Sequence, residues 1–297
     1  MSRIVRFAWL TLGINVAVIL LGALVRSTGS GAGCGRSWPT CQGEIVPALE
    51  GATAIEYTHR LGSGLALVSV GVLAVWVWLR IPKGEPARVG AALSLVAIVI
   101  EALIGAMIVL AEWVTDDSSL ARVVAVPLHL VNTLFLLAAL ALTIFWLSGG
   151  GRLSPRSHPV VWRWVVLGGM AVVLLAATGA ITALADTLFP KTGSGPSGSG
   201  EAHFLTDLRV IHPILAVAAA SIGWWASGRS TGTRSGAARF LPLLVGLMLL
   251  TGVLNVVLGV PVWMQLTHLL LADTLWIAYV FASAHALEIP VGAAQPA

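Results

Sequence analysis

Four histidines inside apolar segments are the side chains of this sequence most able to do chemistry: His59, His129, His212 and His268. Each lies one or two helical turns from the same end of its segment, so we expect the four to share one depth. A single intramembrane histidine could equally make a hydrogen bond between two helices, because polar side chains at membrane depth need partners. Four at matched depth instead predict a common chemical role.

The ligand chemistry of imidazole narrows that role. Imidazole binds zinc, copper and iron, but a compact zinc site needs three or four ligands converging from one place. Two histidines on different helices suit an axial pair on a haem, held between the facing helices of a bundle. We therefore expect one site at His59 and His129 and another at His212 and His268, each with two histidine ligands or with one ligand and an open position.

Glu56 makes the two expected sites unequal. It precedes His59 by three residues and shares its helix face, whereas Arg209 holds the matching place before His212. The carboxylate could simply pair with Arg60 on the helix surface. It could also serve as a general base beside only one of the two metals.

The remaining candidates are two cysteines and two intramembrane acids. Cys34 and Cys41 lie in the first loop expected outside the cytoplasm, where disulfides are permitted, as a structural link or as a redox-active pair that exchanges with a partner. Glu101 lies near the middle of an apolar segment and either makes hydrogen bonds within the bundle or belongs to a proton path. The role of Asp273 is left open.

The elements that must position these residues are membrane-spanning helices. Of 297 residues, 57% are hydrophobic and 10% charged, and the mean hydropathy is +0.92. The net charge of +4 is too small and too dispersed to indicate a nucleic-acid partner. We expect an all-α integral membrane protein with eight spans, because each run is long enough to cross the bilayer. The expected spans are Phe7–Val25, Thr53–Leu79, Val89–Ala111, Val123–Leu147, Val160–Leu184, Leu208–Ala226, Phe240–Gly259 and Trp263–Ala286.

The spans divide into two pseudo-symmetric four-helix bundles, residues 1–150 and 151–297. His59 has a counterpart in His212, and the His129-Leu130 pair is echoed at His268-Leu269. Lys and Arg concentrate in alternate loops, which by the positive-inside rule places both termini in the cytoplasm of a cell membrane. The Gly/Ser-rich stretch Gly193–Gly200 is expected to be flexible.

At several places the sequence resembles the haem A synthases. The resemblance lies in Gly22-Ala-Leu-Val-Arg26-Ser-Thr-Gly-Ser-Gly31 leading into Cys34, Trp38-Pro39-x-Cys41-x-Gly43, Glu56-Tyr-Thr-His59-Arg60, and the three later histidines. It implies conversion of haem O to haem A for cytochrome oxidase, through two hydroxylations of a ring methyl and loss of water. It further implies that His59 and His129 bind the substrate haem, and that His212 and His268 bind a haem b.

The same resemblance implies the other functional groups, namely Glu56 as the acid or base at the methyl, and the pair Cys34 and Cys41. Arg26, Arg60 and Arg209 are candidates for the haem propionates, or interfacial residues that reach toward the headgroups. The expected partners are membrane lipid, haem O synthase and an electron-transfer or thiol-redox protein, and an oligomer is left open.

The sequence departs from the family pattern at two places, and two other protein classes are alternatives to a haem A synthase. The chain lacks a second cysteine pair, which some members of the family carry, and Gly35-Arg36-Ser37 replaces the usual acidic residue before Trp38. A quinone-linked di-haem b electron carrier without haem modification would also use paired histidines, but it does not need Glu56. A transporter would explain the repeats but not four histidines at one depth.

Overall fold

The computed structural model describes residues 1–189, 204–228 and 236–289, and it is helical apart from two very short strands. The stretch Gly193–Gly200 lies outside the described residues. The long helices are α1 (Arg3–Ser27), α2 (Gly51–Arg80), α3 (Pro86–Leu110), α4 (Leu120–Leu147), α5 (Pro159–Leu188), α7 (Ile211–Gly228), α8 (Gly236–Val257) and α9 (Val262–Leu287). The short elements are η1 (Ser30–Ala32), α6 (Phe204–Leu208), β1 (Arg152–Leu153) and β2 (Glu288–Ile289).

Seven of the described helices are long and apolar enough to cross a membrane, which confirms an all-α integral membrane protein. The sixth predicted span, Leu208–Ala226, corresponds to α7, which begins later, at Ile211. Arg209 and Val210 form a turn between α6 and α7, where the Arg209 side chain donates to the carbonyls of Ala185 and Phe189 on α5. The side chains of α7 are described over Ile211–Ser221, and this stretch is apolar.

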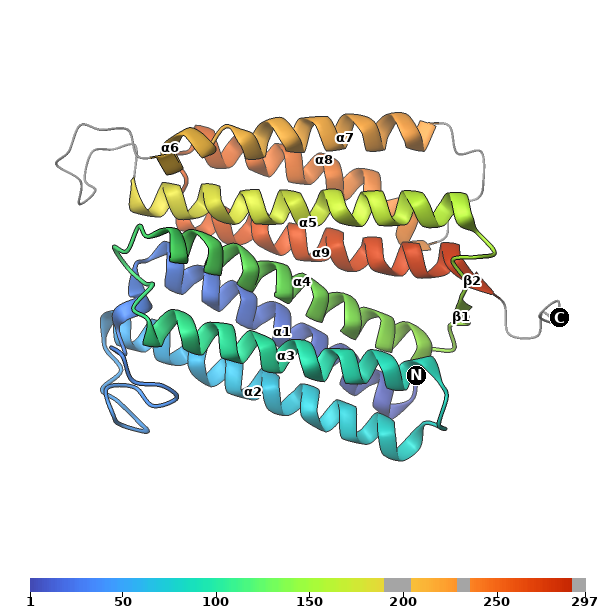
Figure 1. Ribbon diagram of the computed structural model, residues 1–297, viewed down its shortest axis with the longest axis horizontal. Coiled ribbons are helices and arrows are strands. Elements are labelled where there is room, and N and C mark those ends of the chain that lie inside the picture. Colours follow the sequence, from blue (N-terminus) through green and yellow to red (C-terminus); the bar gives the residue numbers. More distant parts are fainter. Residues whose placement is uncertain (190–203, 229–235, 290–297) are drawn as a thin grey trace.

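The long helices run nearly parallel (Figure 1), and we call α1, α2, α3 and α4 the first group and α5, α7, α8 and α9 the second. Helices α1 and α4 also contact α5 and α9 across the boundary, and the division into two pseudo-symmetric bundles stays a prediction. In the first group, contacts run in a closed ring from α1 to α2, α3, α4 and back to α1. In the second group, the same kind of ring joins α5, α7, α8 and α9. The histidine-bearing helices α2 and α4 therefore occupy opposite corners of one ring, and α7 and α9 those of the other.

The two ends of the molecule differ in charge. The loops near the start of α1, between α2 and α3, and between α4 and α5 lie together at one end (Figure 1), and we call it the basic end for Arg80, Lys83, Arg88, Arg152 and Arg156. There β1 pairs antiparallel with β2. The cysteine-loop end, opposite, carries residues 28–50 and the loop after α3. That the basic end faces the cytoplasm stays a prediction.

The connection between the last two long helices, α8 and α9, is very short, and its backbone conformation explains why the helix ends there. The break between α8 and α9 contains Gly259 with φ of +76°, Val260 with φ of +61°, and Pro261 at the cap of α9. A left-handed residue followed by proline cannot continue a helix. Two crossings consequently follow one another with only a short connection.

The buried core of the first group lies toward the basic end. Its fully buried apolar residues include Leu12 on α1, Leu73 and Val77 on α2, and Leu140 on α4. Toward the cysteine-loop end, by contrast, residues 18–27 of α1 are all only half-buried. The helices therefore pack tightly on one side of the histidine level and more openly around it.

Candidate functional site

Each of the four histidines lies against a glycine on the neighbouring helix that precedes it in the chain. His59 faces Gly22 of α1, and His129 faces Gly105 of α3. In the second group His212 faces Gly179 of α5, and His268 faces Gly252 of α8. The same arrangement thus occurs four times, once in each helix pair.

The closeness of these contacts shows why glycine is needed at two of the positions. A Cβ added at Gly22 would lie 3.0 Å from Cε1 of His59, and one at Gly179 would lie 3.1 Å from Cε1 of His212. A Cβ at Gly252 or Gly105 would lie 3.5 or 3.8 Å from the facing ring, which is ordinary contact. The absent side chains leave room for the imidazoles beside the neighbouring helix.

Groups of the neighbouring helices lie at Nδ1 of three of the four rings, and two of them are within hydrogen-bond reach with good geometry. Nδ1 of His212 lies 3.0 Å from the carbonyl oxygen of Leu175, and Nδ1 of His268 lies 2.9 Å from Oγ1 of Thr251. Nδ1 of His129 lies 3.2 Å from Oε1 of Glu101. Nδ1 of His59 is buried and has no hydrogen-bond partner among the described residues. A partner at Nδ1 fixes the tautomer and orients Nε2 toward a metal.

The structure brings the histidines together in the predicted pairs. His59 and His129 are near enough to interact electrostatically, and so are His268 and His212. Across the described residues, no three side chains of His, Cys, Asp or Glu gather at one point, as a compact zinc site would need. Two imidazoles from opposite corners, with glycines behind them and incompletely buried helix surface around them, fit a planar haem in each group. The ligand roles themselves stay predictions.

Glu56 is buried and fully engaged in the first group. Its Oε2 accepts from the backbone N–H of Cys34 at 2.8 Å, and its Oε1 accepts from Nε of Arg60 at 3.1 Å and from Nη2 at 2.5 Å. The pair with Arg60 therefore exists, but it is not the solvent-exposed pair expected from the sequence, because the two side chains are only 4% and 10% exposed. Breaking a buried pair from one side costs about 3–5 kcal/mol, far more than a surface pair. A role of Glu56 as a base stays a prediction.

Cys34 and Cys41 form a disulfide with a Cα–Cα distance of 4.5 Å. Both are completely buried and pack against Tyr57, whose hydroxyl donates to the carbonyl of Ile45. The loop also presses on the start of α2, because a Cβ at Gly33 would lie 2.5 Å from the backbone of Ala52. Burial of both sulfur atoms favours the structural role over exchange with a partner, since exchange requires access.

The three arginines proposed for propionates all contact protein groups. Arg26 donates from α1 to Ala183 O and Thr187 Oγ1 of α5, and to Gln265 Oε1 of α9, so it connects the two groups of helices. Nη1 of Arg60 donates to two carbonyls of the cysteine loop, and Nε of Arg209 lies 3.0 Å from Oδ1 of Asp186. A propionate would have to share or displace these contacts.

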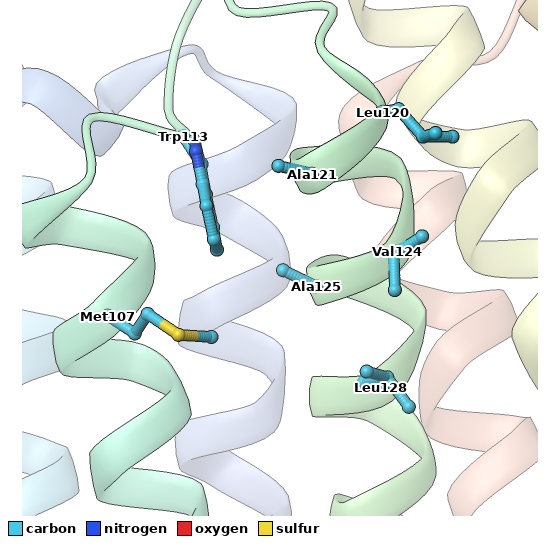
Figure 2. A pocket seen from close by; sticks show the side chains of 7 residues that line it. All are labelled: Met107, Trp113, Leu120, Ala121, Val124, Ala125 and Leu128. Atoms are coloured by element: carbon cyan, nitrogen blue, oxygen red, sulfur yellow. The ribbon is translucent and has the colours of Figure 1, made fainter.

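Two further features lie near the site, an intramembrane acid whose role the sequence leaves open and a groove that the sequence does not predict. Asp273 of α9 is 1% exposed, and no side chain or backbone group of the described residues makes a hydrogen bond to its carboxyl. An open apolar groove of about 370 Å³ lies at the cysteine-loop end of α3 and α4. Figure 2 shows Trp113 reaching down beside α3 toward Met107, with Ala125 of α4 turned toward it. Ala125 and Leu128 belong to the turn of α4 before His129, so the groove ends next to His129 along this helix.

Comparison with known proteins identifies one matching family and several similar proteins. A profile of the COX15-CtaA family, described as a cytochrome oxidase assembly protein, matches residues 5–280. A Thermus thermophilus protein named protoheme IX farnesyltransferase is 47% identical over 302 residues, covering 97% of this chain and 49% of that protein. A heme A synthase of Bacillus licheniformis is 47% identical over 89 residues, or 30% of each chain. Another, of Geobacillus kaustophilus, is 43% identical over 116 residues, covering 39% of this chain and 36% of that protein.

The extent of these matches differs. This chain spans about half the length of the Thermus relative that it matches almost throughout. The heme A synthases match over about a third of their own length. The family profile, however, extends from within α1 into α9 and takes in both pairs of histidines and the disulfide. A match of that extent means that the chain belongs to the COX15-CtaA family of cytochrome oxidase assembly proteins.

Proposed function

We propose that this chain is a haem A synthase, which oxidises a ring methyl of haem O to the formyl group of haem A for cytochrome oxidase assembly. The observation that carries the proposal is the fourfold arrangement of histidine against glycine, with one histidine pair in each group of helices. Membership of the COX15-CtaA family and the similarity to heme A synthases support the same activity.

The two pairs are proposed to have different occupants. His59 and His129 would hold the substrate haem O, while His212 and His268 would hold a resident haem b that relays electrons. When bound, haem iron supplies the redox chemistry, and the protein supplies ligation, orientation and proton handling. The apolar groove beside His129 supports haem O as the occupant of the first site, because the isoprenoid chain that distinguishes haem O needs apolar surface.

Glu56 is the proposed proton acceptor at the substrate methyl. It lies one helical turn before His59 on the same face of α2, and Arg60 and the Cys34 N–H hold its carboxylate in place. The second site has an arginine, Arg209, at the corresponding position, so acid–base chemistry belongs to the first site alone.

The proposed cellular location and partners rest on membership of the same family. We propose a multi-pass protein of the cell membrane, surrounded by lipid, with the basic end and both termini in the cytoplasm. The long match to a protein named protoheme IX farnesyltransferase supports haem O synthase as the partner that delivers the substrate. An electron-transfer or thiol-redox protein is the further proposed partner, which would exchange electrons with this chain.

Glu56→Gln tests the catalytic part of the proposal. The variant should still bind haem but accumulate haem O or a hydroxylated intermediate, because general-base contributions are typically about 10²- to 10⁴-fold in rate. Product must be measured per folded, haem-loaded protein, since the buried contact with Arg60 also affects stability. Glu112→Gln makes the same chemical change in an exposed pair with Arg36 and serves as the control.

Near-normal haem A output from Glu56→Gln would leave Glu56 with a structural role only. If wild-type protein also produced no modified haem, the di-haem electron carrier would be the better description.

A further inference from the structure

Glu101 is the intramembrane acid that the proposed mechanism does not use. It lies near the middle of α3, and its Oε1 is 3.2 Å from Nδ1 of His129 on α4. Asn132 donates from Nδ2 to Oε2 of Glu101 at 2.5 Å, and Oγ1 of Thr133 lies 2.5 Å from Oε1. Both of these residues belong to the turn of α4 that follows His129. The carboxyl is thus held against one face of α4, directly behind the histidine.

This arrangement distinguishes His129 from the other three histidines. Nδ1 of His268 meets the neutral hydroxyl of Thr251, and Nδ1 of His212 meets a backbone carbonyl and the hydroxyl of Thr178. His59 has no hydrogen bond of good geometry at Nδ1 among the described residues. Among the described residues, a carboxyl group lies behind His129, in the proposed substrate site, and behind none of the other three histidines.

A carboxylate at Nδ1 changes an imidazole in two ways. It fixes the ring so that Nε2 points at the metal, and it makes Nε2 a stronger electron donor than a neutral partner would. The contact of Glu101 with His129 is at ion-pair distance but not aligned as a hydrogen bond. Such contacts commonly tighten when the ligand binds. Asn132 also donates to the Ala97 carbonyl at 3.0 Å, which anchors the group to α3.

We propose that Glu101 is a positioning residue that orients His129 and strengthens it as a residue that would hold the substrate haem. This inference rests on the proposed function, because it takes His129 as a ligand. The two proposed haem sites would then differ in a second respect: besides Glu56, the first site would have a histidine ligand backed by a carboxyl group. When haem is bound, the iron with the carboxylate-backed ligand would have the lower reduction potential of the two.

The test isolates the first site in a His212→Ala/His268→Ala background and uses ferric protohaem as the probe. Glu101→Ala should weaken haem binding by about 10- to 100-fold, the usual effect of removing the partner of a metal-binding histidine. Glu101→Gln keeps a hydrogen-bond acceptor but removes the charge. It should therefore retain most of the affinity and shift the reduction potential upward, with a matching change in the electron paramagnetic resonance of the ferric haem.

Two further variants keep the test decisive. Thr133→Val preserves shape and loosens Glu101 without touching its charge, so a smaller shift in the same direction is expected even if the Glu101 variants fold poorly. Glu112→Gln should change neither affinity nor potential, because that carboxylate pairs with Arg36 in an exposed loop.

Unchanged affinity, potential and spectrum in the variants at Glu101 and Thr133 would overturn the inference and leave the proposed function intact. If the His212→Ala/His268→Ala protein without any further substitution bound no haem, both the inference and the proposed function would be overturned.

Discussion

The contact between Gly179 and His212 offers a sharp test of the second site. Gly179→Ala places a Cβ 3.1 Å from Cε1 and 3.3 Å from Nδ1 of the ring. The ring cannot easily retreat, because Nδ1 is held by the Leu175 carbonyl at 3.0 Å and contacts Thr178 Oγ1 at 3.3 Å. Gly252→Ala is the matched control in the same site, since its Cβ would lie 3.5 Å from His268.

The expected magnitude follows from the strain of one added methyl group. Overpacking a filled interior costs about 1–3 kcal/mol. If that strain is relieved by displacing His212 from its ligand position, haem affinity falls by about 5- to 150-fold. Replacing glycine by alanine inside a helix is otherwise favourable by roughly 0.5–1 kcal/mol. The helix should therefore be no less stable, and loss of haem can be assigned to the ring.

The assay is a titration of purified apoprotein with haem, followed by the b-type absorbance per mole of protein. Gly179→Ala should show reduced affinity, whereas Gly252→Ala should be close to wild type. The corresponding pair in the first site, Gly22→Ala against Gly105→Ala, should show the same order. Equal affinities for Gly179→Ala and wild type, or a larger loss in Gly252→Ala, would refute the idea that these glycines make room for the ligands.

Three other predictions concern the histidines, the disulfide and the connection between the helix groups. His212→Ala and His268→Ala should each remove the low-spin b-type absorbance of the second site while leaving helicity intact, and full absorbance in both would exclude this assignment. Cys34 and Cys41 should resist thiol labelling in unfolded protein until a reductant is added, whereas ready labelling without it would contradict the disulfide. Arg26→Ala should lower the free energy of unfolding in detergent by about 2 kcal/mol or more, because charged hydrogen bonds to α5 and α9 are lost. An unchanged melting temperature would count against that connection.

Much of the fold and part of the site could be predicted because membrane insertion leaves strong signals in a sequence. Long apolar runs predicted eight spans, and seven of the described helices are long and apolar enough to cross a membrane. Gly259 with Pro261 marked the break between the last two helices. The intramembrane histidines stood out because polar residues are rare at that depth. The cysteines stood out as the only two in the chain, and the structure confirms their disulfide.

The remaining features depend on contacts between segments distant in the chain. Gly22 and Gly179 carry no polar signal, and only the packing of neighbouring helices shows that they face histidines. Arg26 looked like a residue of the first group, but its guanidinium reaches α5 and α9 of the second. The burial of the Glu56–Arg60 pair arises from the cysteine loop folding over α2, which helix spacing alone does not reveal. Glu101 could be recognised as unusual, but its partner could not be identified.

The most direct test of the proposed activity is extraction and identification of the haems from membranes in which this chain is produced together with a source of haem O. Haem A, or haem O hydroxylated at a ring methyl, should appear with the wild-type chain and be absent when His59 or His129 is replaced by alanine. Protohaem and unmodified haem O alone, from wild-type protein with haem bound in both groups of helices, would contradict the proposed oxidation of haem O.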